Sequence, residues 1–392
     1  MGLSLAVAVL LTTGPMVDSA SADKLFQPDN LVVSRSVYQG TASTVTLGQL
    51  LPPNCPSTAQ CGGPNKAGVP AIATGAFPAI GSTNNVWNND TVDGSFGVTS
   101  PIFLDEMTPQ GKVVNTLPID PSRIVTSFSS KSELAINLST NRNALTFMGY
   151  VAPVNTLDAS NANTPGVVDP TNPVGENVYR AVAEVDQNGK LKVTETNAYS
   201  GNNGRAAFLS EGLYYTAGND NNGSGTPASL TTSTGAELIV PGATPGVPQM
   251  IGNFSITQYG FPPDKAGKDN NFRGLTIFDH TLYVTKGSGS NGINSVYQVG
   301  AAGHLPTADN AAATPFTILP GFPATLAKAA DAQNPFGLFF ADDNTLYVAD
   351  EGDGTTANAP TSPNAGLQKW VRDASGTWHR AYVLQNGLQL GQ

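Results

Sequence analysis

Charge, cysteine and long apolar runs are all scarce in this chain. Only 12% of its 392 residues are charged, the net charge is −10, and no run of basic residues occurs. Nucleic acids and anionic membranes bind through clusters of Lys and Arg, so both are excluded as expected partners. No apolar stretch reaches the roughly 20 residues that a transmembrane helix needs, and the sequence therefore predicts no transmembrane segment.

Recognisable catalytic motifs are missing as well. The chain has no Gly-x-Ser-x-Gly element that would present a nucleophilic serine. Its glycine-rich segment 287–292 lacks the Lys and the following helix of a phosphate-binding loop. The three histidines, His280, His304 and His379, are predicted on two turns and an outer strand, which does not bring them together as a metal site or a catalytic triad. The sequence leaves open whether the protein is an enzyme.

The N-terminus is typical of an exported protein. Residues 3–11 form a short apolar core, and Ala20-Ser21-Ala22 gives a small-x-small cleavage pattern, although no Lys or Arg precedes the core. We therefore predict a signal peptide over residues 1–22 and a secreted or periplasmic location; a buried strand or helix is the alternative. The two cysteines, Cys55 and Cys61, are close in sequence, which in an exported chain predicts a local disulfide rather than free thiols.

What the chain does contain is a repeated pair of apolar segments. Residues 271–278 lead through a short polar turn into 281–284, and residues 334–340 lead in the same way into 345–348. Each copy is typical of a β-hairpin. Weaker copies occur at 133–147 and 205–215.

Equivalent leucines show that these inner hairpins have a nearly constant period. Leu145, Leu213, Leu282 and Leu346 are separated by 213 − 145 = 68, 282 − 213 = 69 and 346 − 282 = 64 residues. A β-rich unit that recurs at a fixed spacing is typical of a propeller.

A second kind of hairpin alternates with the first. It is predicted where strands begin at 102–106, 182–185, 296–299 and 367–371, with turns rich in Gly and Asn. An inner and an outer hairpin together make a four-stranded antiparallel blade. We expect an all-β propeller with five blades visible, the first of which has a single inner strand at 31–38 and the last an outer strand at 378–384.

The segment Gly337-Leu338-Phe339-Phe340 and the segment from Leu346 to Asp350 resemble the six-bladed propellers of the NHL-repeat, gluconolactonase and strictosidine-synthase type. Residues 102–107, 132–134 and 346–354 are similar to a group of exported bacterial propeller proteins without assigned function. The resemblance covers most of residues 31–392. It implies six blades in the complete protein, so that residues 23–392 form one propeller domain that is incomplete at its C-terminus.

Long irregular segments between the hairpins are expected on one face of the propeller, where binding usually resides. The residues that open or close the inner hairpins would surround the channel mouth on this face. The ligand-binding candidates among them are Glu133, Arg205, Arg273, Lys286 and Asn334. The alternative is that these side chains pair across blades and only satisfy strand ends.

Calcium is the cofactor that the sequence suggests. Asp350-Glu351-Gly352-Asp353-Gly354 supplies three carboxylates on a glycine-rich turn, and calcium prefers such oxygen ligands. Asp is also an ordinary turn residue, so a purely structural loop is the alternative. The resemblance to propeller lactonases implies Glu133, Asn271, Asn334 and Asp350 as counterparts of a calcium site. Arg205 and Arg273 depart from that pattern, because they would bring positive charge to the place of the metal.

Two functional hypotheses follow. The first is a non-enzymatic binding or scaffold protein that takes a small molecule, a glycan or a protein through its loop-rich face. The second is a calcium-dependent hydrolase of lactone or ester type, with its site in the channel mouth and with Asn271, Asp350, Glu351 and Asp353 as metal ligands.

Export can be checked by mass. The secreted protein should begin at Asp23, because cleavage after Ala22 follows the small-x-small pattern. Reduction should add the mass of two hydrogens, since Cys55 and Cys61 are expected to be joined. Intact-mass spectrometry before and after reduction measures both. A retained N-terminus, or two thiols that alkylate without reduction, would contradict the prediction.

Overall fold

The computed structural model describes residues 25–41, 43–53, 69–71, 95–128, 130, 134–167, 178–219, 235–252, 254–262, 271–287, 292–329, 332–388 and 390. The predicted signal peptide, Cys55, Cys61 and Glu133 lie outside these residues.

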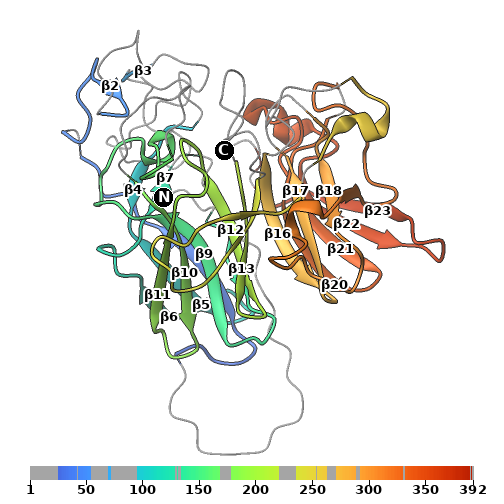
Figure 1. Cartoon of the computed structure of the whole chain (residues 1–392), viewed down its shortest axis with the longest axis horizontal. Helices are drawn as coiled ribbons and strands as arrows, with labels where there is room; N and C mark the ends of the chain where they lie inside the picture. Colours follow the sequence, from blue (N-terminus) through green and yellow to red (C-terminus); the bar gives the residue numbers. More distant parts are fainter. Residues whose placement is uncertain are drawn as a thin grey trace, which may run out of the picture.

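The described residues form an all-β propeller with five antiparallel blades, as the repeat predicts (Figure 1). The first blade has the strand order β1-β5-β6, with β1 at Leu31–Ser36, β5 at Ile102–Met107 and β6 at Val113–Pro118. The second has the order β8-β9-β10-β11, at Asn137–Leu138, Ala144–Tyr150, Arg180–Asp186 and Leu191–Thr196. The first blade thus has the single inner strand that the sequence predicts.

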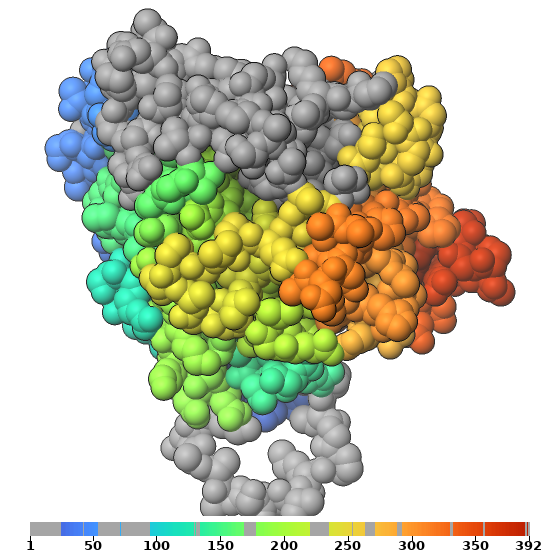
Figure 2. Space-filling model, viewed as in Figure 1, coloured from blue at the N-terminus to red at the C-terminus, as the bar shows by residue number. Residues whose placement is uncertain are grey.

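The remaining three blades are four-stranded and follow the chain from inside to outside. The third contains β12 (Gly204–Ser210), β13 (Leu213–Gly218), β14 (Ala236–Ile239) and β15 (Gln249–Met250). The fourth contains β16 (Phe272–Phe278), β17 (Thr281–Lys286), β18 (Ser295–Val299) and β19 (Phe316–Ile318). The fifth contains β20 (Pro335–Asp342), β21 (Thr345–Asp350), β22 (Gly366–Arg372) and β23 (Trp378–Leu384). In Figure 2 the chain runs from the blue and green of the first blades to the orange and red of the last two.

Two small sheets stand outside the blades. β2 (Leu50–Leu51) pairs with β3 (Val69–Pro70), and β4 (Val98–Ser100) pairs with β7 (Thr126–Phe128). The sequence analysis predicts neither sheet, because β2, β3 and β4 fall in a long stretch without a strand pattern and β7 has only three residues. It also misses the outer hairpin of the third blade, β14 and β15, because these strands are short and 12 residues of the described segment 235–252 lie outside any strand.

Tight turns set the register of the inner hairpins. Asp279 and His280 join β16 to β17 with φ of 43° and 55°, and Glu211 and Gly212 join β12 to β13 with φ of 51° and 77°. Positive φ at both central residues is the geometry whose twist matches that of the two strands. The period of the leucines is the length of one blade, because Leu145, Leu213, Leu282 and Leu346 lie on β9, β13, β17 and β21, the second strand of each inner hairpin.

The blades are held together by apolar side chains between their faces. The strands β9, β12, β16 and β20 follow one another side by side around the centre. One cluster joins the first two blades, with Val32 and Leu104 against Phe147 and Ala183. The largest cluster continues from the third blade to the fifth. Within it Phe272 is fully buried and its ring stacks on Phe316, with centroids 5.1 Å apart.

Short 3-10 turns are the helical elements that the structure assigns; they include η2 (Ala159–Asn161), η3 (Ile256–Tyr259), η5 (Ala311–Ala313) and η6 (Thr356–Thr361). Among the described residues no helix is long and apolar enough to cross a membrane.

Removing one ring from the inter-blade core should destabilise the propeller strongly. Phe272→Ala is expected to lower the free energy of unfolding by about 3–5 kcal/mol, because it deletes buried ring contacts and leaves a cavity. Leu47→Ala is the control: Leu47 is 62% exposed, and its truncation should change stability by no more than about 0.5 kcal/mol. Urea unfolding measures both. Equal effects would contradict this description of the core.

Candidate functional site

Buried cations occupy the strand ends that face the loop-rich side of the propeller. Arg205 and Arg273 are the second residues of β12 and β16, and Lys286 is the last residue of β17. Their exposed fractions are 1%, 5% and 0%. Charged side chains are seldom buried without hydrogen-bond partners, so their contacts decide what they can do.

Arg205 joins the third blade to the fourth. Its Nη1 donates to Asn271 Oδ1 at 2.5 Å and to the carbonyl oxygen of Phe272 at 2.8 Å. The structure thus brings Arg205 together with Asn271, a residue that the sequence suggests as a calcium ligand. The amide oxygen of Asn271 accepts a hydrogen bond from the guanidinium in this arrangement.

Arg273 joins the fourth blade to the fifth. Its Nη2 lies 2.7 Å from Glu351 Oε1, its Nη1 donates to the carbonyl oxygen of Gly287, and its guanidinium lies over the ring of Phe336 at 5.2 Å. Glu351 is the exposed partner, with 45% of its side chain accessible against 6% for Arg273. In this ion pair the carboxylate of Glu351 is accessible from solvent, whereas the guanidinium of Arg273 is buried.

Lys286 begins a second connection between the same two blades. Its Nζ donates to Asn294 Oδ1 at 3.1 Å, and Asn294 Nδ2 donates to Asn334 Oδ1 at 2.7 Å. Asn334 Nδ2 in turn donates to the carbonyl oxygen of Gly352 at 3.0 Å. The predicted residues Lys286 and Asn334 are therefore linked through Asn294, which the sequence analysis does not single out because it opens an outer strand.

Asp350 lies beside this chain of amides. Its Oδ1 accepts from the backbone N–H groups of Asn334 and Gly352, at 3.1 and 2.7 Å. Its Oδ2 is buried and has no hydrogen-bond partner among the described residues. Burial is the largest cause that raises the pKa of Asp350, from 3.8 to about 7, and the two backbone donors only partly oppose it.

Asp353 takes a different position from Asp350 and Glu351. It is exposed, and its carboxylate accepts from the N–H of Thr355 at 2.8 Å and from Asn358 Nδ2 at 2.7 Å, bonds that lower its pKa. It thus stabilises the turn that leads into η6. In the part of the chain that the structure describes, no three His, Cys, Asp or Glu side chains gather closely enough to hold a metal ion.

A further buried arginine, missed by the sequence analysis, repeats the pattern one blade earlier. Arg180 begins β10 and is fully buried; its Nε and Nη2 donate to the carbonyl oxygen of Asn202, and its guanidinium lies 5.3 Å from the ring of Tyr150. Burial lowers the pKa of Arg180 to about 10. It opens an outer strand, and the sequence argument considered only the inner ones.

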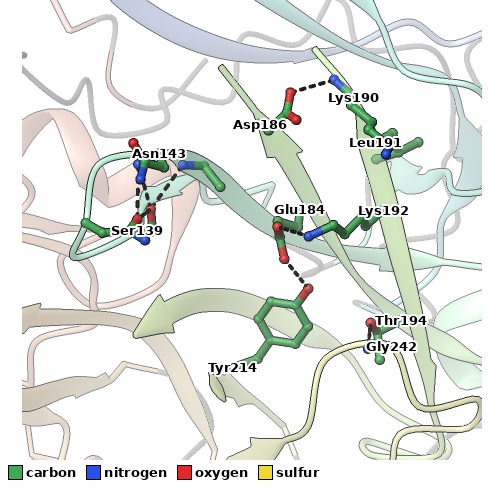
Figure 3. A network of polar contacts seen from close by, with 12 residues as sticks. Ser139, Asn143, Glu184, Asp186, Lys190, Leu191, Lys192, Thr194, Tyr214 and Gly242 are labelled. Atoms are coloured by element: carbon green, nitrogen blue, oxygen red, sulfur yellow. Dashed lines mark hydrogen bonds and ion pairs between the residues drawn. The ribbon is translucent and has the colours of Figure 1, made fainter. Parts of the chain in front are cut away.

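Another polar network joins the outer hairpin of the second blade, β10 and β11, to β13 in the inner hairpin of the third (Figure 3). Glu184 accepts from Lys192 Nζ at 2.7 Å and from the hydroxyl of Tyr214 at 2.8 Å. Burial is the largest cause that raises the pKa of Tyr214, and the bond to Glu184 adds to it. The phenol therefore stays neutral at physiological pH and acts as a fixed donor between blades.

An apolar cavity of about 210 Å³ lies elsewhere in the described part of the chain. Its lining combines loop prolines with small apolar residues, namely Pro52, Pro53, Val151, Ala152, Pro153, Thr156, Leu157, Ala159, Ala162 and Val178. None of the residues predicted as ligand-binding lines it.

Comparison with known proteins adds little. No protein-family profile and no curated protein matches the chain significantly. Among solved structures, a chimera of the apocarotenoid oxygenase ACO and RPE65 aligns at 11% identity with a TM-score of 0.23, and a variant of the Synechocystis apocarotenoid oxygenase aligns at 13% identity with a TM-score of 0.22. Each alignment covers 73% of this chain and 44% of the other. These scores are too low to support an argument about function.

The buried carboxyl of Asp350 predicts a pH dependence of stability. Its pKa is raised on folding, so the folded state binds the proton more tightly than the unfolded chain does. The stability that comes from this tighter proton binding is complete below the unfolded pKa of 3.8 and is lost as the pH rises to about 7. Asp350→Asn cannot ionise, and it should gain stability relative to the parent protein over this window.

Asp353→Asn is the matched control, because the pKa of Asp353 is lowered on folding. The stability contributed by the ionised Asp353 is present above its unfolded pKa and is lost as the pH falls. The variant should therefore be less stable than the parent at neutral pH and equally stable in acid. Urea unfolding at a series of pH values compares the three proteins. Parallel curves for Asp350→Asn and the parent would contradict the raised pKa.

Proposed function

We propose that this protein is a non-enzymatic binding or scaffold protein that acts outside the cytoplasm, with its ligand held at the loop-rich face. The observation that carries the proposal is the use of the buried cations. Arg205 bonds to Asn271 and Phe272, and Arg273 bonds to Glu351, so both guanidinium groups reach from one blade to the next. These bonds hold both guanidinium groups at the boundaries between blades, which favours a rigid frame at the mouth.

Within this frame Glu351 is the group that a ligand can reach. Its side chain is 45% exposed, and its position is fixed by Arg273, which is itself held against Phe336. A carboxylate fixed in this way suits a hydroxyl, amine or amide donor on a glycan, peptide or small molecule, because its lone pairs are oriented before the ligand arrives.

The alternative is a calcium-dependent hydrolase of lactone or ester type. The observation that favours it is the buried Oδ2 of Asp350, which has no described partner and lies on the residue next to Glu351. The rest of the suggested ligand set fits calcium less well. Asn271 accepts from Arg205, Glu351 pairs with Arg273, and the carboxylate of Asp353 is held in a separate turn.

One set of measurements separates the two functions. The proposal expects no change in Tm when calcium or EDTA is added, and no turnover of lactones or aryl esters in either condition. It also expects capture of a ligand from glycan and peptide arrays, weakened about tenfold by Glu351→Ala because the fixed acceptor is removed.

Asp343→Ala is the matched control, since it removes an exposed carboxylate from the turn between β20 and β21. Thermal unfolding of both variants ensures that weakened capture does not come from unfolding. Calcium-stimulated hydrolysis that Asp350→Asn abolishes would overturn the binding proposal in favour of the enzyme.

A further inference from the structure

The apolar cavity lies at the loop-rich face of the propeller, in the second blade. Its lining comes from the prolines at 52–53 after β2, from residues 151–162 after β9, and from Val178 just before β10. In this blade β9 is the second inner strand and β10 is the first outer strand. The connection between them is therefore of the same kind as that between β21 and β22, which carries Glu351. The cavity and the channel mouth thus share one face but belong to different blades.

The walls of the cavity change from buried to exposed residues. Its inner end is formed by four buried apolar residues, Leu157, Ala159, Ala162 and Val178. Pro53 and Pro153 are exposed and therefore mark its entrance. A molecule from solvent can thus pass between the proline rings and reach a floor of small apolar side chains.

Hydrogen bonds hold the floor of the cavity in place. Arg180 Nη1 donates to the carbonyl oxygen of Val178 at 2.9 Å, and its Nη2 donates to that of Ser160 at 2.8 Å. The carbonyl oxygen of Ala162 accepts from the N–H of Gly201 at 3.1 Å. Walls fixed in this way do not close by a small shift of the loops. A ligand therefore finds a preformed site and has little chain to order when it binds.

The polarity of the lining restricts the chemistry of the ligand. Of the described residues that line the cavity, Thr156 is the polar one and none is charged. The Thr156 hydroxyl donates to the carbonyl oxygen of Pro153 at 2.8 Å, so its oxygen is left to accept a hydrogen bond. A buried water needs two to four polar partners, which such walls do not supply. The cavity therefore favours an uncharged apolar molecule with a single hydrogen-bond donor.

The size of the cavity restricts the ligand further. An engineered apolar cavity of about 150 Å³ binds benzene, and pockets for drug-sized molecules begin at about 300 Å³. The volume of about 210 Å³ lies between the two and suits a single ring with a small substituent. Three of the lining residues are prolines, Pro52, Pro53 and Pro153. Proline rings pack well on aromatic rings, as in the recognition of proline-rich segments, so a flat aromatic ring fits these walls.

We propose that this cavity binds a small phenol, with the ring among the prolines and the hydroxyl donating to Thr156 Oγ1. A carboxylate or ammonium group is rejected, because the lining offers no charge or hydrogen-bond donor to replace its hydration. The site goes beyond the function proposed for the channel mouth, since it belongs to the second blade, whereas Glu351 follows β21 of the fifth.

Titration of the full chain with p-cresol, followed by saturation-transfer NMR, tests the proposal. A dissociation constant of about 0.1–1 mM is expected, because the ligand has few atoms. Toluene lacks the hydroxyl and should bind about three- to tenfold more weakly, which is the effect of one hydrogen bond. 4-Methylbenzoate is a carboxylate at neutral pH, and it should show no saturable binding over the same range of concentration.

Three variants place the ligand in the cavity. Thr156→Val should lower the affinity for p-cresol to that for toluene and leave the affinity for toluene unchanged, because it removes only the hydrogen-bond acceptor. Ala159→Leu and Ala162→Leu fill the floor and should each abolish the binding of both compounds. Since they occupy empty space, they should not lower the Tm of the ligand-free protein. Ala302→Leu is the control, because Ala302 is exposed on the turn between β18 and β19.

The outcomes that overturn the proposal are distinct. The absence of saturable p-cresol binding up to about 10 mM overturns it, and so does equal binding of 4-methylbenzoate. Binding that both filled variants leave unchanged, or that Ala302→Leu weakens equally, places the ligand elsewhere. Unfolding of both filled variants shows that the floor has no room for a ring and also overturns it. An affinity for p-cresol that Thr156→Val does not change contradicts the hydrogen bond to Thr156.

Discussion

Face-to-face packing of neighbouring blades is the constraint on which the rest of this structure depends. A four-stranded sheet has two faces, and in the middle blades both are covered by apolar side chains, with Phe272 and Tyr297 among the fully buried ones. The polar groups at the channel mouth must therefore be satisfied within the boundaries between blades. Arg205 and Arg273 meet this need in the same way, each by bonding to the blade that follows it. Packing and electrostatics thus act on the same boundaries.

The repeat and the inner hairpins were predictable because they depend on local chemistry. Alternation of apolar residues and two-residue turns such as Asp279-His280 are written in contiguous sequence, and the equivalent leucines show their spacing directly. The outer hairpin of the third blade was not predictable, since its second strand, Gln249–Met250, is too short to show a period. Short strands of this kind are defined by the neighbour they pair with, not by their own composition.

The sequence predicted which polar residues stand at the strand ends but not the bonds that they make. Strand ends pointed to Arg205, Arg273, Lys286 and Asn334, and the structure links the last two through Asn294. The separation of Asp353 from Asp350 could not be foreseen, because adjacent carboxylates on a turn look alike in sequence. Only the fold buries one and exposes the other, and it thereby raises one pKa and lowers its neighbour's.

The direction of the arginine contacts has a consequence for synthesis on the ribosome. Arg180 bonds to Asn202, Arg205 to Phe272 and Arg273 to Glu351, so each cation has one partner in a segment closer to the C-terminus, while Arg180 also donates to the carbonyl oxygen of Ser160 before it. In a chain that is synthesised from its N-terminus, each of these contacts with a later segment can form only once that segment is present. Each boundary between blades is therefore completed by residues of its successor.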